Sequence, residues 1–371
     1  MTTSSDPRLV IFLCGDVMTG RGIDQILPHH GNPELRESAV SDARTYVALA
    51  ERVSGSIPAP TDFEWPWGEA LSVLDEFAPD IRLINLETTI TVGGEFAPGK
   101  AVHYRMHPGN VGCLSAIRPD ACALANNHIL DFGPQGLADT LSALERAGIC
   151  GIGAGLTADQ AERPAVADVG GGRRVVIASY GMQSSGIPGS WAATATQPGV
   201  AIVTELSDRS AATIAERVAD GKRPGDVTIV SLHWGSNWGY HVAPSQVHFA
   251  RRLIDLGVDV VHGHSSHHPR PIEMYRGKPI LYGCGDTVDD YEGITGYEAF
   301  RPELRLLYFV AIEPCGDIAL RMVPMRMRRM RLERVARADT EWLRATMEHI
   351  SRQFGIGVFD TPDGFLTVGV P

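Results

Sequence analysis

The sequence predicts an α/β protein, and two observations carry this prediction. Short apolar runs alternate with amphipathic stretches of helical length along most of the chain. Polar side chains directly follow several of the apolar runs, as Asp16 follows the run from Leu9 to Cys14. Because open α/β sheets bind their ligands at the carboxyl ends of strands, these side chains are candidates for a functional site.

Length and composition limit the class of protein. The 371 residues are enough for one large domain or two moderate ones, and 44% of them are hydrophobic. The net charge of −11 argues against nucleic acid as a partner, because a phosphate-binding face needs a basic excess. Six dispersed cysteines form no metal motif. With no signal peptide or membrane-length apolar run, we expect a soluble, cytoplasmic protein without a membrane partner; the sequence leaves its oligomeric state open.

Each predicted strand is a run of β-branched and other large apolar residues, bounded by turn residues. The expected strands span residues 9–14, 80–87, 119–125, 149–155, 174–180, 226–232, 258–261, 279–286, 304–312 and 318–327, of which the last two form a hairpin. The expected helices span residues 38–53, 67–77, 110–117, 136–147, 207–219, 244–256 and 340–354. We expect one domain over residues 8–335 and a C-terminal helical extension over 336–371 that packs on it.

A turn with four histidines within seven residues follows the apolar run that ends at Val261. Imidazole is a common metal ligand, so the cluster indicates a metal site rather than a solvated polar loop. His264 and His267 are the better ligand candidates. His262 is expected to face the opposite side, and the role of His268 is left open.

Further candidate ligands stand at the ends of other predicted strands. The full set of predicted metal ligands is Asp16, Glu87, Asn127, His233, His264 and His267. Oxygen and imidazole donors without a thiolate suit Mn, Zn or Fe, and we expect one or two divalent ions. More than four ligands, with carboxylates that can bridge, favour two. The alternatives are a helix cap at Asp16, an ion pair at Glu87, turn chemistry at Asn127 and a core histidine at His233.

His128 follows Asn127 and is the predicted catalytic acid or charge-stabilising group. Asp131 either orients His128 or caps the following helix. Asn85 and Asn126 are candidates for substrate binding. Arg21 or Arg270 would grip an anion on the substrate.

The motifs at these positions resemble the CapA family of poly-γ-glutamate capsule synthesis proteins, which is related to the calcineurin-like metallophosphoesterases. The resemblance rests on Gly15-Asp16-Val17-Met18, Asn85-Leu86-Glu87, Ala125–Gly133 (ANNHILDFG), His233-Trp234-Gly235 and Gly263-His264. It implies a four-layer αββα sandwich with mixed sheets and a dinuclear metal centre formed by the six ligands named above. Two features depart from the wider phosphoesterase pattern: Met18 stands where a histidine is usual, and one extra serine separates His264 from His267.

Our leading hypothesis is a metal-dependent hydrolase in which a metal-bound hydroxide attacks a phosphoester of a small anionic substrate. One alternative is an amide hydrolase or ligase-like enzyme that acts on γ-glutamyl or other peptide-like substrates. The other is a non-catalytic protein that binds a metal or an anion, because a fold alone does not fix a function.

Overall fold

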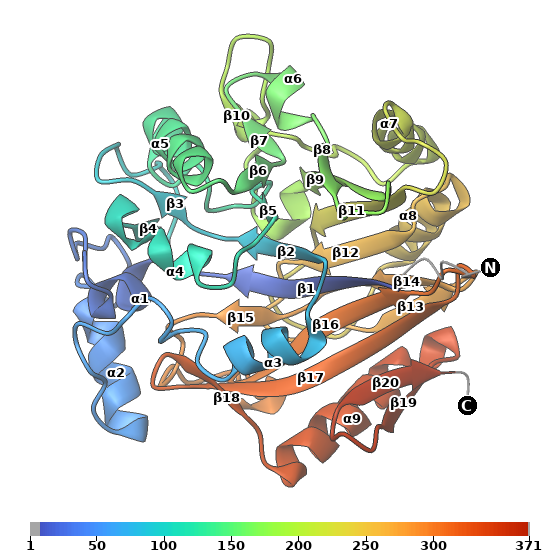
Figure 1. Cartoon of the computed structure of the whole chain (residues 1–371). Helices are drawn as coiled ribbons and strands as arrows, with labels where there is room; N and C mark the ends of the chain where they lie inside the picture. Colours follow the sequence, from blue (N-terminus) through green and yellow to red (C-terminus); the bar gives the residue numbers. More distant parts are fainter. Residues whose placement is uncertain (1–7, 370–371) are drawn as a thin grey trace.

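Two mixed β-sheets form the centre of the protein in the computed structural model, which describes residues 8–369 (Figure 1). In the larger sheet β1 pairs in parallel with β2 and β15 and antiparallel with β16. Its strands are, in spatial order, β19 (Gly357–Asp360), β20 (Leu366–Gly369), β17 (Ile318–Arg328), β16 (Leu304–Ile312), β1 (Leu9–Val17), β2 (Ile81–Leu86), β5 (Ala121–Ala123) and β6 (Cys150–Ile152), with β15 (Asp286–Val288) beside β1 and β18 (Arg331–Arg334) beside β17.

The smaller sheet is also mixed, with parallel strands at its centre and antiparallel strands at both edges. Its order is β13 (Ile272–Tyr275), β14 (Lys278–Leu281), β12 (Val260–His264), β11 (Val227–His233), β9 (Arg174–Gly181) and β8 (Ala165–Asp168). Two short ladders pair β3 (Thr89–Ile90) with β4 (Arg105–Met106) and β7 (Ala154–Gly155) with β10 (Gly199–Val200).

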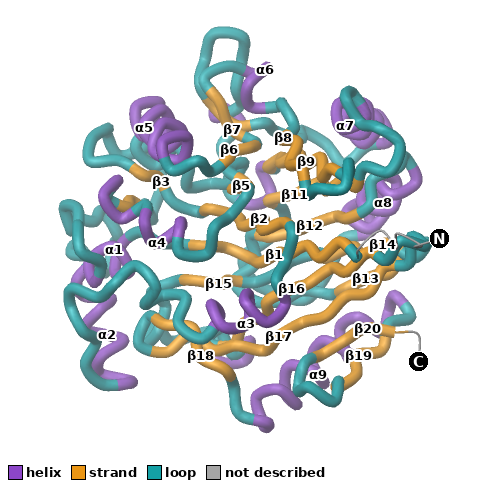
Figure 2. The backbone as a smooth tube through the Cα atoms, in the orientation of Figure 1, coloured by secondary structure: helices purple, strands orange, loops and turns teal. Residues whose placement is uncertain are grey.

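Helices lie around the strands, as the purple segments of Figure 2 show. The α-helices are α1 (Arg21–Ile26), α2 (Arg44–Ser54), α3 (Ala70–Phe77), α4 (Gly112–Ser115), α5 (Gly133–Arg146), α6 (Ala158–Ala161), α7 (Asp208–Ala219), α8 (Pro244–Asp255) and α9 (Arg337–Ser351). The 3₁₀ helices are η1 (Pro108–Asn110), η2 (Gln183–Ser185), η3 (Gly189–Trp191), η4 (Glu298–Phe300) and η5 (Arg352–Phe354).

Alternate residues of β1 enter two different cores, because successive side chains of a strand point to opposite faces. Ile11 and Leu13 pack in a core that also contains Ile177 and Ile229 of the smaller sheet, so this core lies between the two sheets. Val10, Phe12 and Cys14 pack with α2, α3 and α5 on the other face of the larger sheet. A third core joins the smaller sheet to α7 and α8. Both faces of β1 are therefore buried, as its continuous apolar run predicts.

The mixed α/β class predicted from the sequence is confirmed. The predicted strands have counterparts, and the hairpin of residues 304–312 and 318–327 is β16 and β17. The helix expected over residues 38–53 begins only at Arg44, because Leu35 and Ala43 form backbone hydrogen bonds in a turn before it. Residues 336–369 contain α9 and then the β19–β20 hairpin, which joins the larger sheet through β17, so this extension is not purely helical. The domain boundary at residue 335 stays a prediction.

Between residues 8 and 369, no helix combines the length and the apolar character that crossing a membrane requires.

Candidate metal centre

The candidate site lies where the strands of both sheets end. In the larger sheet Asp16 of β1 is in register with Asn85 of β2 and with Asp286 of β15. In the smaller sheet His233 of β11 is in register with His264 of β12. These pairings bring side chains from distant parts of the sequence to one buried level of the fold, as the prediction from strand ends requires.

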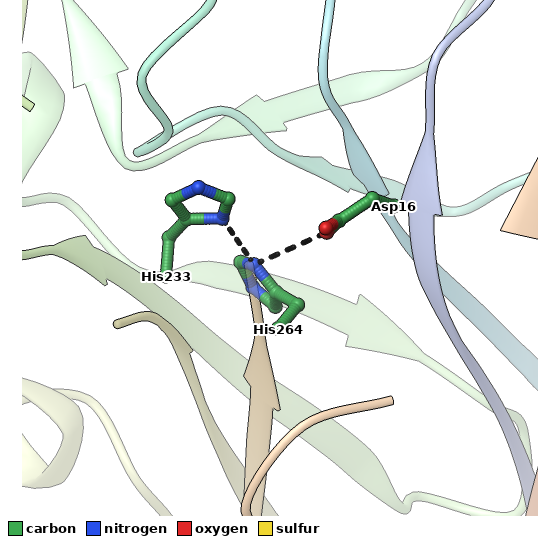
Figure 3. A group of neighbouring side chains, drawn as sticks. All are labelled: Asp16, His233 and His264. Carbon is green, nitrogen blue, oxygen red and sulfur yellow. Dashed lines mark hydrogen bonds and ion pairs between the residues drawn. The ribbon is translucent and has the colours of Figure 1, made fainter. Parts of the chain in front are cut away.

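A first cluster consists of Asp16, His233 and His264, which point toward one another (Figure 3). The Nδ1 atoms of the two imidazoles are 2.8 Å apart, and Nδ1 of His264 is 3.8 Å from Oδ1 of Asp16. Nε2 of His233 lies 2.8 Å from the side-chain oxygen of Asn127. Burial holds the pKa of His233 and His264 well below the usual range, so both rings are neutral, which is the form that binds a metal.

A second cluster shares Asp16 and adds His267 and Asp286. Nδ1 of His267 is 2.9 Å from Oδ1 of Asp286, while the buried Oδ2 of Asp286 has no hydrogen-bond partner within residues 8–369. Burial and then the charge of Asp286 raise the pKa of Asp16 to about 7. Burial also opposes a charge on His267, but Asp286 outweighs it and raises the pKa of this histidine.

Glu87 lies between these clusters and the His128 side chain. The Asn85 amide donates to Oδ1 of Asp16 at 2.7 Å and to Oε2 of Glu87 at 3.3 Å. The other oxygen of Glu87 is 3.7 Å from Nε2 of His128 and 4.0 Å from Nε2 of His233. Burial and then the nearby Asp16 raise the pKa of Glu87 well above its usual range.

This donor set fits a divalent cation. Asp16, Glu87 and Asp286 are three carboxylates that repel one another and are buried from solvent. A cation would offset that repulsion and would give the free oxygen of Asp286 a partner. Oxygen and neutral imidazole donors suit Mn, Zn or Fe, and the identity of the metal stays a prediction. Within the described chain the two clusters could hold two ions that share Asp16.

Side chains that are not candidate ligands hold the first cluster in place through hydrogen bonds. The Ser231 hydroxyl is 2.8 Å from Nε2 of His264 and 3.1 Å from Nδ1 of His262, whose Nε2 contacts the carbonyl oxygen of Cys14 at 2.8 Å. The expectation that His262 faces the opposite side is wrong, because residues two apart on a strand share a face. His262 therefore supports the ligand His264 rather than standing aside.

The histidine turn carries backbone strain. Ser265 has a φ of 104°, a conformation that side chains rarely adopt, and its N–H lies 3.2 Å from Oδ2 of Asp16. Such strain concentrates at functional sites, where the surrounding structure enforces it. His267 follows two residues later, and its Nε2 is 3.0 Å from the Asn237 side chain.

A polar group beside the clusters is formed by His128, Asp131 and Lys100. Nδ1 of His128 lies 2.6 Å from Oδ2 of Asp131, which also accepts from the Tyr104 N–H at 2.7 Å. Asp131 therefore orients His128. The alternative, that Asp131 caps the following helix, is wrong, because α5 begins without a capping hydrogen bond from any side chain. Burial lowers the pKa of His128 to about 4, although Asp131 opposes this shift.

Lys100 was not predicted from the sequence. Its ammonium group donates to Oδ1 of Asp131 and to the Asn127 carbonyl, and it lies 3.4 Å from Nδ1 of His128. It stands in a loop of Pro and Gly residues that gave no signal of a function.

The four predicted substrate-binding residues have different surroundings. Asn126 donates to the Asn85 side chain and to the Leu86 carbonyl, so both buried amides hold the scaffold together. Arg21 forms ion pairs with Glu37 and Asp290. Arg270 donates to the Ser236 carbonyl and hydroxyl, both at 2.9 Å, and so contacts the loop after β11.

Asp286 was not among the predicted ligands, although its place after Gly285 at the end of an apolar run was a signal of the kind that identified Asp16.

A family model and individual relatives both place the chain among capsule synthesis proteins. Residues 10–291 match the model of the bacterial capsule synthesis protein family PGA_cap. The chain is 60% identical over 369 residues to a probable polyglutamine synthesis accessory protein of Mycobacterium tuberculosis, a match that covers 98% of this chain and 97% of that relative.

More distant relatives carry the CapA name. The PGA biosynthesis protein CapA of Bacillus subtilis is 24% identical over 288 residues, which cover 78% of this chain and 65% of that protein. The capsule biosynthesis protein CapA of Bacillus anthracis is 25% identical over 287 residues, which cover 76% of this chain and 60% of that protein.

Proposed function

The chain belongs to the CapA family of bacterial capsule synthesis proteins, and we propose that it is a metal-dependent hydrolase that cleaves a phosphoester in support of polyglutamate synthesis. The observation that carries the proposal is the pair of buried clusters that share Asp16. Their position beside the His128–Asp131 pair supports a catalytic role over a purely structural one. A structural site would need only one closed set of four ligands.

The fold supports the same proposal. We infer a four-layer αββα sandwich of the metallophosphoesterase type, in which the larger and smaller sheets form the two inner layers. The support is the division of the apolar side chains into one core between the sheets and two cores beneath helices.

The residues have distinct roles in this proposal. Asp16, His233 and His264 would hold one cation, and Asp16, His267 and Asp286 would hold a second, with Mn, Zn or Fe as candidates. Asn127 and Glu87, which lie beside His233, would add oxygen ligands. When bound, such ions polarise a phosphoryl oxygen and lower the pKa of water. His128 keeps its Nδ1–H on Asp131, so that Nε2 faces Glu87 with a free lone pair, and this nitrogen would take up a proton before it gives one to a leaving group. Lys100 holds Asp131 in place through Oδ1.

The test compares Asp16→Ala with His248→Ala, which removes an exposed histidine on α8 that pairs with Asp208. We expect the Asp16 variant to lose bound metal, measured by elemental analysis, together with hydrolysis of aryl phosphoesters in the presence of Mn. The His248 variant should keep both properties. Unchanged metal content and turnover in the Asp16 variant would contradict the proposal.

A second candidate function is hydrolysis of an amide in γ-glutamyl substrates. The names of the relatives favour it, because they refer to polyglutamine and PGA synthesis. The same purified protein should be assayed against γ-glutamyl peptides and phosphoesters in parallel. Turnover of the peptides alone would select this second function, and tight metal binding without any turnover would indicate a binding protein.

A further inference from the structure

A cavity of about 240 Å³ opens beside His267. Aromatic side chains from four segments line it: Tyr46, Tyr104, Trp238, Tyr291 and Tyr297. Two larger hollows of about 600 Å³ have linings, within residues 8–369, that contain none of the candidate metal ligands. The smaller cavity therefore has the better position for a group attached to the bond that reacts.

The ionic side chains of this cavity already have partners: Arg21 pairs with Glu37 and Asp290, and His267 pairs with Asp286. Arg21 is buried, and its Nε lies 3.1 Å from Oδ2 of Asp290 while Nη1 lies 2.9 Å from Oε1 of Glu37. The same guanidinium lies 3.8 Å from the centroid of the Tyr46 ring and 4.6 Å from that of Tyr104. Two carboxylates and two aromatic faces thus satisfy the one arginine, so an entering anion would meet no unpaired positive charge on it.

The rim of the cavity presents flat apolar surface. The rings of Trp238 and Tyr297 stack with centroids 3.9 Å apart and an angle of 6° between their planes. Tyr297 is nevertheless 41% exposed, and the neighbouring Ile294 is 37% exposed. Large apolar side chains that remain exposed beside a candidate site are typical of a binding surface, because a ligand can remove them from water.

We infer that this cavity binds an uncharged group with a flat apolar face, such as an aromatic ring, on the substrate. As a substrate subsite the inference rests on the proposed function, but binding of the isolated group does not. The polar part of the same substrate would face the carboxylates and imidazoles beyond His267. In this assignment Arg21 does not bind the substrate but packs against Tyr46 and Tyr104 in the cavity wall.

Three probes of similar shape and different charge test the inference on the full chain. Binding of benzyl alcohol, benzoate and benzylamine is measured by ligand-detected NMR without any added substrate. We expect benzyl alcohol to bind roughly tenfold more tightly than benzoate, because Arg21 is already paired. It should also bind more tightly than benzylamine, because the oxygens of Glu37 and Asp290 already accept hydrogen bonds from Tyr46, Arg21 and the Gly22 N–H. Equal or tighter binding of benzoate would overturn the inference.

Tyr297→Ala locates the binding, with Phe359→Ala as the matched control. Phe359 is 44% exposed on β19, so both variants remove an exposed aromatic ring. The Tyr297 variant should weaken the binding of benzyl alcohol roughly fivefold, and the control should leave it unchanged. Equal binding by the two variants would overturn the inference. Because these measurements need no turnover, a failure of the proposed hydrolase activity would leave their outcome unaffected.

Discussion

The two candidate metal clusters share Asp16 but differ in how firmly the chain fixes them. His233 and His264 stand at the ends of adjacent parallel strands, and Ser231 holds His264 from behind. His267 lies in the turn beyond the strained Ser265, and Asp286 keeps one buried oxygen without a partner. Asn237 contacts His267 as Ser231 contacts His264, but only the second cluster keeps a buried carboxylate oxygen that an ion would have to satisfy. The difference implies a tighter first site and a weaker second one.

The largest expected effect comes from removing one imidazole from each cluster in turn. His264→Ala should lower metal affinity and turnover by more than roughly 100-fold, because it removes a ligand of the better-ordered site. His267→Ala should cost roughly tenfold and should remove only the weaker ion. Elemental analysis and metal titration of both variants measure this contrast. A greater loss in the His267 variant would reverse the proposed order of the two sites.

The contrast also explains what the sequence could and could not reveal. Asp16, Glu87, Asn127, His233 and His264 are predicted ligands because each follows an apolar run, and parallel strands bring their ends together. Asp286 also follows an apolar run, but the sequence does not show that β15 pairs with β1, across about 270 residues of chain, and so places it beside Asp16. Lys100 was missed because it is an ordinary lysine in a loop until the fold places it against Asp131.

The sequence also does not show which carboxylate an arginine pairs with. Arg21 suggested an anion site because nothing nearby in the chain showed that Asp290 would neutralise it. The β19–β20 hairpin was also missed, since its two strands are short and pair with the larger sheet only through β17. The alternation of strands and helices predicted the fold class, whereas the register of distant strands decided which side chains meet.

A smaller effect on metal affinity is expected from Ser231, which contacts a ligand of the first cluster only. Ser231→Ala removes the hydroxyl that contacts both His262 and His264, while it leaves every candidate ligand in place. Metal affinity of the first site should fall roughly tenfold, and that of the second site should not change. Ser179 offers the matched control, because it is buried at the same register on the adjacent β9 and its hydroxyl has no hydrogen-bond partner among the described residues. An equal effect of Ser179→Ala would show that the loss comes from packing.

The smallest expected effect concerns the strain in the histidine turn. Ser265→Gly keeps the N–H that faces Asp16 and removes the side chain that makes a φ of 104° costly. Relief of that strain stabilises the fold by about 1 kcal/mol, and the greater freedom of glycine in the unfolded chain offsets part of it. For a chain of this size we expect the melting temperature to rise by about 1–2 °C.

Metal content shows whether the strain serves the second cluster. If the serine holds the turn that presents His267, the glycine variant should bind the weaker ion less tightly, although the fold itself is more stable. Ser266→Gly is the control, because Ser266 donates to the His268 carbonyl at 2.9 Å and its backbone is not in the left-handed region. That variant should melt at a lower temperature. A lower melting temperature for Ser265→Gly as well would mean that the turn is not strained, and the difference between the two clusters would then rest on the strand positions of His233 and His264 and on the unpaired oxygen of Asp286.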